Sequence, residues 1–168
     1  IDNFYILGNF IDSDVGVTEW LAPKDGCGHT SEDSVTIRVK NYAGLPTSEN
    51  IIVKYSVDGG ITEYTDTIKN SIPSDEDTVF TFKPKVDLSE PGFYENAYAT
   101  TVNSNDENHS NDTLFNKIYA APTYNLPYEN DFEDEVKFWI TKGKNPSWEL
   151  GEPNGSSIDT AYSGNNAW

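Results

Sequence analysis

The sequence predicts an all-β protein whose largest part is a sandwich of two packed sheets. Hydrophobic and polar residues alternate with a period of two in several separate stretches, which is the pattern of strands that bury one face. Gly, Pro, Asn and Asp residues recur between these stretches at spacings typical of sandwiches. No stretch shows the periodicity of an amphipathic helix. The 168 residues have room for one ordinary domain, or for one domain and part of another.

Two strands are predicted near the N-terminus. The first is "DVGVTEW" (residues 14–20), in which valines alternate with small or polar residues. The second is "DSVTIRVKN" (residues 33–41), in which Val35, Ile37 and Val39 alternate with polar side chains. Each strand should therefore bury one face and expose the other.

A β-hairpin is predicted next. The run "NIIVKYSV" (residues 50–57) places its hydrophobic side chains on one face, and a second β-rich run covers residues 61–68. Asp-Gly-Gly at 58–60 joins them, because glycine adopts the positive φ that a tight hairpin requires. Three further strands, "TVFTF", "GFYENAYATT" and "DTLFNKIYA", bring the total to about seven between residues 14 and 120.

The stretch "VDLSEPGFY" refines the topology. A Pro91-Gly92 turn stands two residues before Tyr94, after a short polar corner that begins at Asp87. In immunoglobulin-like sandwiches, a tyrosine at the start of the sixth strand bonds back to the backbone of the preceding corner. We therefore predict an immunoglobulin-like Greek-key sandwich in which Tyr94 has a structural role and no catalytic one.

The pattern changes at Pro122, where "APTYNLPY" indicates a linker with extended backbone. A further strand is predicted within "LPYENDFEDEVKFW", and Trp139, Trp148 and Trp168 belong to a segment too short to bury three indoles alone. At the other end, "IDNFYILG" also has the pattern of a strand. We expect neither end to fold independently: each should pack against residues outside this chain, against the flank of the sandwich, or against a partner by strand addition. The expected parts are residues 1–11 as the last strand of a preceding module, 12–121 as the complete sandwich, and 122–168 as a linker and an incomplete second module.

A resemblance to known modules supports this division. The stretches "DVGVTEWLAPKDGCGHTSEDSVTIRVKNYAG", "VKYSVDGG", "VDLSEPGFY" and "NDENHSNDT" resemble the CARDB-like, adhesion-related immunoglobulin-like modules found in large secreted proteins of Bacteroidota. The stretches "LPYENDFEDEVKFW", "PSWELGEPNG" and "AYSGNNAW" are similar to the opening of MAM-like or cleaved-adhesin jelly rolls, and "IDNFYILG" is similar to their last strand. The resemblance implies an extracellular or cell-surface location and export by the type IX secretion route.

The charge argues against some partners. The chain carries 28 acidic and 11 basic residues, for a net charge of −17, so its surface would repel the phosphates of nucleic acids. No hydrophobic run is long enough to span a bilayer, so membrane insertion is not expected.

Five tripeptides match the acceptor pattern for O-glycosylation in that bacterial group, which is Asp, then Ser or Thr, then a hydrophobic residue. The matching hydroxyls belong to Ser34, Thr67, Thr78, Thr113 and Thr160. Five matches exceed the roughly one expected by chance for this composition. The alternative is that Asp before a β-branched residue simply opens strands, and both interpretations stay open.

Catalytic motifs are not evident. Cys27 is the single cysteine, so no disulfide can form within the chain. His29 and His109 are the two histidines, and neither stands at metal-ligand spacing from the other. Cys27 and His29 would need a third, orienting group to act as a nucleophile and base. We therefore predict that the chain is not an enzyme.

Calcium is the cofactor that the sequence could support. In "NDFEDE", alternate positions place Asp131, Glu133 and Glu135 on one face of a predicted strand, where their oxygens could ligate Ca²⁺ with help from elsewhere, and Asp2 is a residue of the right type. A second acidic loop, "NSNDENHSND", has no EF-hand glycine or closing glutamate and is expected to be a solvated turn.

The predicted function is that of a non-catalytic structural and adhesion module, a spacer and display unit of a large secreted or cell-surface protein. Its expected partners are neighbouring modules of the same polypeptide or copies of itself, together with cell-surface or secretion-system proteins and glycans. One alternative is an accessory region of a secreted peptidase or glycan hydrolase. Another is a carbohydrate-binding jelly roll that uses Trp139, Trp148 or Trp168, although large aromatic side chains more often pack inside.

Overall fold

The computed structural model describes residues 11–48, 50–133, 138–141 and 143–167. The chain divides into two compact units between Ala121 and Pro122. The predicted strand "IDNFYILG" lies outside the described residues, so its assignment to a preceding module stays a prediction. The two units are described separately below.

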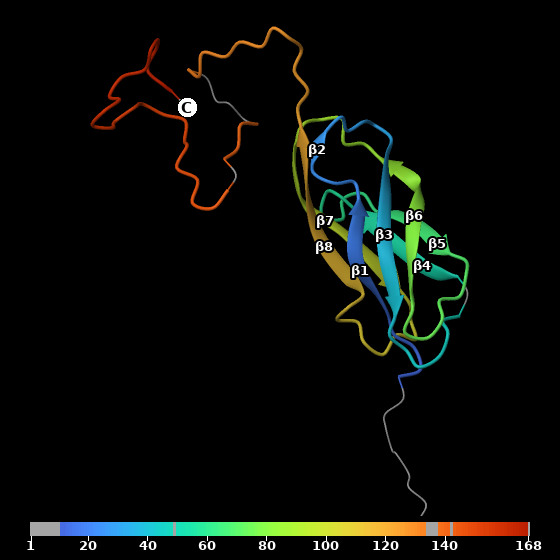
Figure 1. The fold of residues 1–168 in the computed structure, drawn as a ribbon. Coiled ribbons are helices and arrows are strands. Elements are labelled where there is room, and N and C mark those ends of the chain that lie inside the picture. The colour runs from blue at the N-terminus through green and yellow to red at the C-terminus, as the bar shows by residue number, and fades with distance from the viewer. Residues whose placement is uncertain (1–10, 49, 134–137, 142, 168) are drawn as a thin grey trace, which may run out of the picture. The chain divides into compact units, whose positions relative to one another are not determined.

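The first unit is an all-β sandwich of two sheets (Figure 1). One sheet has three strands in the order β1-β3-β6, and the other has five in the order β2-β8-β7-β4-β5. This arrangement is an immunoglobulin-like β-sandwich, as the sequence predicts. The strands are β1 (Val15–Ala22), β2 (Gly26–Cys27), β3 (Asp33–Asn41), β4 (Ile51–Ser56), β5 (Tyr64–Ile68), β6 (Asp77–Val86), β7 (Gly92–Val102) and β8 (Thr113–Ala121).

The alternating residues of the strands form the core between the sheets. Val35, Ile37 and Val39 of β3 are completely buried, while their polar neighbours are partly exposed. Across the core, the ring of Tyr55 meets Phe82 edge to face with their centroids 4.7 Å apart. Burial of these side chains supplies the main driving force for folding, at roughly 2–3 kcal/mol for each large hydrophobic residue.

The two predicted turn motifs have the expected local geometry. Gly59 and Gly60 of the hairpin between β4 and β5 have φ angles of 74° and 93°, which non-glycine residues rarely adopt. The Tyr94 hydroxyl donates a hydrogen bond to the Glu90 carbonyl at 3.0 Å, which closes the corner that precedes β7.

The strands β1 and β8 run in the same direction, from one end of the sandwich to the other. Near the start of β8, the Val17 amide donates to the Asn111 carbonyl at 3.2 Å. At the end of β8, the short strand β2 pairs with it in parallel through Gly26 opposite Ala120. The chain from β1 to β2 therefore runs alongside β8 in the same direction. Residue 11 lies at the end of the sandwich where β8 begins, and residue 121 lies at the opposite end (Figure 1).

The second unit, residues 122–167 as described, has little regular structure. An isolated antiparallel bridge joins Gly151 to Ala167, and the described residues of this unit form no strand. The strand predicted within "LPYENDFEDEVKFW" is therefore not present in its described residues. A strand requires a ladder of backbone hydrogen bonds to a neighbouring segment, whereas Glu133 in this stretch accepts the Asn165 and Asn166 amides through its side chain.

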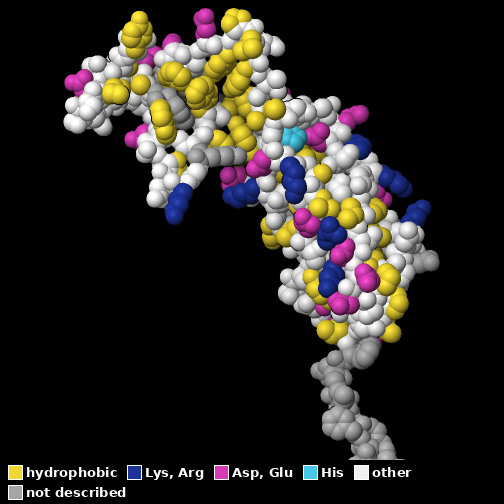
Figure 2. All heavy atoms as spheres, in the orientation of Figure 1, with side chains coloured by type: hydrophobic (Ala, Val, Ile, Leu, Met, Phe, Trp, Pro, Cys, Tyr) yellow, Lys and Arg dark blue, Asp and Glu magenta, His cyan; other side chains and the backbone are white. Residues whose placement is uncertain are grey.

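Hydrophobic side chains gather on the visible face of the second unit (Figure 2). Leu126, Trp148, Ile158 and Tyr162 are among those with large exposed fractions. Across the described residues of both units, no helix has the length and hydrophobicity needed to cross a membrane.

Candidate metal centre

The β7–β8 loop (residues 103–112) is shaped by short polar hydrogen bonds within the chain. The Asn103 side-chain oxygen accepts a bond from the Asn105 amide at 3.1 Å, and the Asp106 Oδ1 accepts one from the Asn108 amide at 2.8 Å. Asn and Asp favour such turns because their side chains imitate a backbone carbonyl. The resulting tight turns bring three potential metal ligands to one place.

These ligands are Asp106, His109 and Asp112. Their ligand atoms all lie within 4.8 Å of one another, and the His109 Nδ1 lies 2.8 Å from the Asp112 Oδ2. Asp106 is only 7% exposed, whereas the His109 side chain is 67% exposed. The hydrogen bond to Asp112 is the main cause that raises the pKa of His109 above its ordinary value, with burial acting in the opposite direction.

Neighbouring groups hold the two carboxylates in place. The Asp106 Oδ2 accepts a hydrogen bond from the Val15 amide at 2.7 Å, and the backbone carbonyl of Asp112 accepts one from the Thr101 amide at 3.0 Å, which fixes the residue that carries the second carboxylate. Hydrogen bonds of this kind orient the ligands of a metal and keep them in position. The three ligands are therefore arranged before any ion binds.

The donor set indicates which ion would fit. Two carboxylate oxygens and one imidazole nitrogen suit zinc and similar divalent transition metals, which accept nitrogen ligands and leave further positions for water. Calcium instead prefers six to eight oxygen ligands. The triad Asp106, His109 and Asp112 can therefore hold a metal ion, and its nitrogen ligand disfavours calcium.

The prediction of a solvated turn for "NSNDENHSND" does not hold for Asp106, although most of the loop is at least partly exposed. Asp106 is buried, because the loop packs against residues 12–17 of the chain, which are distant in sequence. The signal in the sequence was the spacing of Asp106, His109 and Asp112, one potential ligand at every third residue. The residues that could bind a metal together with His109 are Asp106 and Asp112, three positions to either side of it in the sequence, and His29 is not one of them.

Two of the calcium ligands predicted in the second unit, Asp131 and Glu133, belong to the described residues. The Glu133 carboxylate accepts hydrogen bonds from the backbone amides of Asn165 and Asn166 at 2.9–3.0 Å. The Asp131 Oδ1 accepts one from the Glu133 amide at 3.2 Å, which is a turn and not the expected strand. Glu135 and Asp2 lie outside the described residues. Calcium binding at Asp131, Glu133 and Glu135 therefore stays a prediction.

The predicted glycosylation residues fall mainly at the starts of strands. Ser34 and Thr78 are the second residues of β3 and β6, and Thr113 is the first residue of β8. This placement agrees with the alternative that Asp opens strands at these positions. Thr67 lies inside the edge strand β5, and Thr160 is exposed in the second unit. The hydroxyls of Thr113 and Thr160 therefore belong to exposed residues that a modifying enzyme could reach.

Of the pair Cys27 and His29, the histidine is held by a carboxylate and the cysteine is open to solvent. The His29 Nδ1 lies 2.5 Å from the Asp33 Oδ2, and the His29 side chain is 11% exposed. Cys27 is exposed. The histidine is therefore engaged by the first residue of β3, as a structural contact in the loop that leads into that strand.

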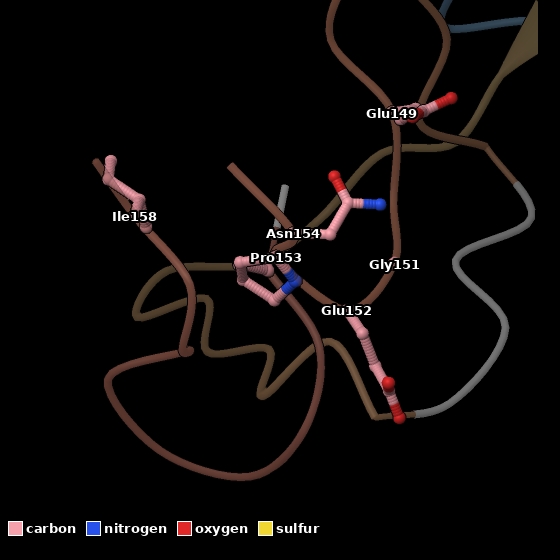
Figure 3. A pocket seen from close by; sticks show the side chains of 7 residues that line it. Glu149, Gly151, Glu152, Pro153, Asn154 and Ile158 are labelled. Atoms are coloured by element: carbon pink, nitrogen blue, oxygen red, sulfur yellow. The ribbon is translucent and has the colours of Figure 1, made fainter. Parts of the chain in front are cut away.

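The second unit contains a shallow hollow, shown in Figure 3. Its lining mixes acidic, amide and aliphatic groups and has no aromatic side chain among the described residues. Another hollow of the same unit is lined by Phe132, Trp139 and Tyr162, among others, and it is the one that offers rings on which a sugar could stack. Trp139 donates from its Nε1 to the Tyr128 hydroxyl at 3.3 Å, Trp148 is 66% exposed, and Trp168 lies outside the described residues. The residues that line the hollow in Figure 3 are Glu149, Gly151, Glu152, Pro153, Asn154, Ile158 and Ala167.

Comparison with known proteins identifies a solved structure with a similar fold. No protein-family model matches the chain. No curated protein matches it. The solution NMR structure of the CARDB domain of the PF1109 protein from Pyrococcus furiosus is similar, with 21% identity, a TM-score of 0.50, and coverage of 66% of this chain and 96% of that domain. At this identity the similarity shows the fold alone: an immunoglobulin-like β-sandwich like that of a CARDB domain.

A crystal structure of the same archaeal domain, in complex with di-metal ions, is also similar. It has 21% identity and a TM-score of 0.48, and the match covers 70% of this chain and 95% of that domain.

Proposed function

We propose that this chain supplies a non-catalytic spacer and display module to a large secreted or cell-surface protein. The observation that carries the proposal is the position of the two ends of the first unit. The chain enters the sandwich where β8 begins and leaves it where β8 ends. A sandwich with ends on opposite sides adds its own length to the polypeptide, whereas the ends of many domains lie close together.

The added length follows from the strands. The nine residues of β8 span about 30 Å at roughly 3.3 Å per residue. A core that includes Val35, Ile37 and Tyr55, all fully buried, supports a rigid unit of that length. Such a module fixes the distance between whatever precedes and follows it.

The extracellular setting and the partners belong to the same proposal. A net charge of −17 supports an extracellular setting, because repulsion between copies of the chain keeps the protein dispersed. The same charge repels the phosphates of nucleic acids. Neighbouring modules of the same polypeptide, or copies of it, would supply the contacts. The exposed hydrophobic side chains of the second unit, such as Trp148 and Tyr162, are suitable for such contacts.

Small-angle X-ray scattering of tandem repeats tests the spacer function. One, two and three copies of residues 12–121 would be joined end to end and compared. We expect the maximum dimension to increase by about 30–40 Å with each copy, from the length of the strands. Copies that fold back beside one another, with little increase in length, would contradict the proposal.

A second candidate function is the binding of a divalent metal ion, which the geometry of Asp106, His109 and Asp112 favours. We propose a transition-type ion such as Zn²⁺ for this triad. Calorimetric titration of the whole chain should detect Zn²⁺ binding that is stronger than Ca²⁺ binding. His109→Asn should weaken the Zn²⁺ binding, whereas Asp75→Asn, at an exposed carboxylate outside the triad, should not. Equal affinity for both ions would argue against the assignment.

A further inference from the structure

The positions at which the chain enters and leaves the sandwich determine which hydrogen bonds carry the load when the chain is pulled. A pull on the two ends acts along β1 and β8, because both strands run from one end of the unit to the other. The hydrogen bonds between strands lie across this direction. We propose that the first unit is a load-bearing module in which tension shears two groups of bonds, one at each end. The proposal rests on the spacer function, since only a module within an extended polypeptide carries tension.

The first group of bonds is the N-terminal clamp, which we define as residues 11–17 and the residues from 101 to 112 that hold them. Backbone bonds join the Glu107 amide to the Ser13 carbonyl at 2.9 Å and the Val17 amide to the Asn111 carbonyl at 3.2 Å. The Thr101 hydroxyl donates to the Val15 carbonyl at 2.7 Å. Further bonds join the Asp12 amide to Glu107 Oε1, the Val15 amide to Asp106 Oδ2, and the Asn103 amide group to the Ser13 hydroxyl.

Two buried carboxylates lie at the centre of the clamp. Asp14 is 3% exposed, and its oxygens accept bonds from the side-chain amides of Asn111 at 2.7 Å and Asn108 at 3.4 Å. Asp106 is 7% exposed and accepts the Val15 amide at 2.7 Å. Bonds to charged acceptors are stronger than bonds between neutral groups, and a buried carboxylate that loses its donors is strongly disfavoured. Breaking any single bond to Asp14 or Asp106 is therefore costly, because it leaves a buried carboxylate oxygen without a donor.

The clamp also requires close packing. A Cβ placed on Gly16 would lie 2.7 Å from the Asn111 carbonyl oxygen and 2.9 Å from its Cγ. Only glycine allows β1 to approach the loop this closely. Gly16 is therefore a part of the clamp, because any side chain at this position would separate β1 from the loop.

The second group of bonds is at the opposite end of the sandwich. The strand β2 pairs in parallel with the end of β8, through Gly26 opposite Ala120 and Cys27 opposite Ala121. The Asp25 carboxylate accepts the Tyr119 amide at 2.9 Å. When residue 121 is pulled away from residue 11, these bonds are loaded together with those of the clamp.

The mechanical consequence is a difference between pulling directions. In shear, the bonds of a group must break in one step, whereas in peeling they break in succession. Each additional hydrogen bond that must break in the same step slows rupture roughly fivefold. Forced unfolding is governed by the unfolding rate and not by equilibrium stability, so this difference is directly measurable.

Single-molecule force spectroscopy of the whole chain tests the proposal. Handles would be attached through engineered cysteines in a Cys27→Ser background and in metal-free buffer. One protein has Asp12→Cys and Ala121→Cys, and is pulled from end to end. The other has Asp12→Cys and Ser104→Cys, and is pulled from two residues at the same end, where the Asn103 side chain contacts Ser13. At equal force, we expect the first to survive on the order of 100-fold longer, if three or more bonds break together.

Variants test which bonds carry the load. In the end-to-end geometry, Asp106→Asn should unfold roughly 10- to 100-fold faster, as expected for the loss of a bond to a charged acceptor. Asp75→Asn is the matched control, because its exposed carboxylate pairs with Lys40 away from the clamp. Should Asp106→Asn fail to fold, the comparison of the two pulling directions with Asp106 intact still decides the matter.

Equal lifetimes in the two pulling directions would overturn the proposal, and so would an Asp106→Asn lifetime equal to that of Asp75→Asn. Neither result would affect the spacer function, which depends on the length added by each copy. A spacer that lengthens as expected but ruptures equally in both directions would be a module that sets distance without bearing load.

Discussion

Replacement of Gly16 by alanine is the sharpest test of the contact between β1 and the β7–β8 loop. The new Cβ would lie 2.7 Å from the Asn111 carbonyl oxygen, a separation that real Cβ atoms essentially never show. The atoms it meets include backbone, which cannot simply rotate away. The same carbonyl accepts the Val17 amide at 3.2 Å, so a shift of the loop would also weaken that bond.

The expected magnitude combines two opposing effects. Overpacking in a well-packed region costs about 1–3 kcal/mol. Alanine also restricts the unfolded chain, which returns about 0.4–1 kcal/mol. The free energy of unfolding should therefore fall by about 1–2 kcal/mol, which lowers the Tm by roughly 4–10 °C for a unit of this size. Urea and thermal unfolding, followed by far-UV circular dichroism, would measure both quantities.

Gly92→Ala is the matched control for this experiment. Gly92 also lies in a strand of the first unit, but no atom lies within 4 Å of a Cβ placed there. We expect this variant to be as stable as the unchanged protein or slightly more stable. The reasoning would be refuted if Gly16→Ala were as stable as Gly92→Ala, since the close approach of β1 to Asn111 would then be absent in solution.

Three further predictions concern single side chains. Tyr94→Phe removes the bond to Glu90 and should lower the free energy of unfolding by about 1 kcal/mol; unchanged stability would show that the corner does not depend on it. Burial, and next the hydrogen bond to Glu63, raise the pKa of Tyr98 to about 12. The neutral phenol therefore stabilises the fold below pH 10 or so, and this contribution is lost as the pH rises through the raised pKa. NMR titration should show Tyr98 ionising above the ordinary range of a tyrosine when Glu63 is intact, and at a lower pH in Glu63→Gln. If the Asp-Ser/Thr patterns are used, mass spectrometry of natively purified protein should find sugar-sized increments on peptides that contain Thr113, and unmodified peptides throughout would end that proposal.

The strands of the sandwich could be predicted because their signals are local. Alternation marks β3, and glycine at 59 and 60 closes the β4–β5 hairpin. The strand β2 was missed because two residues are too few to show alternation. The strand β6 extends beyond the predicted "TVFTF" through Pro84, which is tolerated because β6 is at the edge of its sheet.

The burial of Asp106 and the clamp could not be predicted because the contacts that produce them are not local. Asp106 is buried by residues about ninety positions earlier, as its bond to Val15 shows. Nothing in the composition of "NSNDENHSND" distinguishes such a loop from a solvated one. The strand predicted around Asp131 is not formed by the part of that stretch that the structure describes, because a strand-like pattern forms a strand only where another segment pairs with its backbone.

The distance between the two ends of the first unit tests the central claim most directly. Spin labels at Asp12→Cys and Ala121→Cys, in a Cys27→Ser background of the whole chain, allow that distance to be measured by double electron–electron resonance. A sandwich entered at one end and left at the other predicts a single narrow distribution centred at about 30–40 Å, from nine residues of strand at roughly 3.3 Å each. A distribution centred below about 20 Å, too short for the length of β8, would place both ends on the same side and contradict the spacer function.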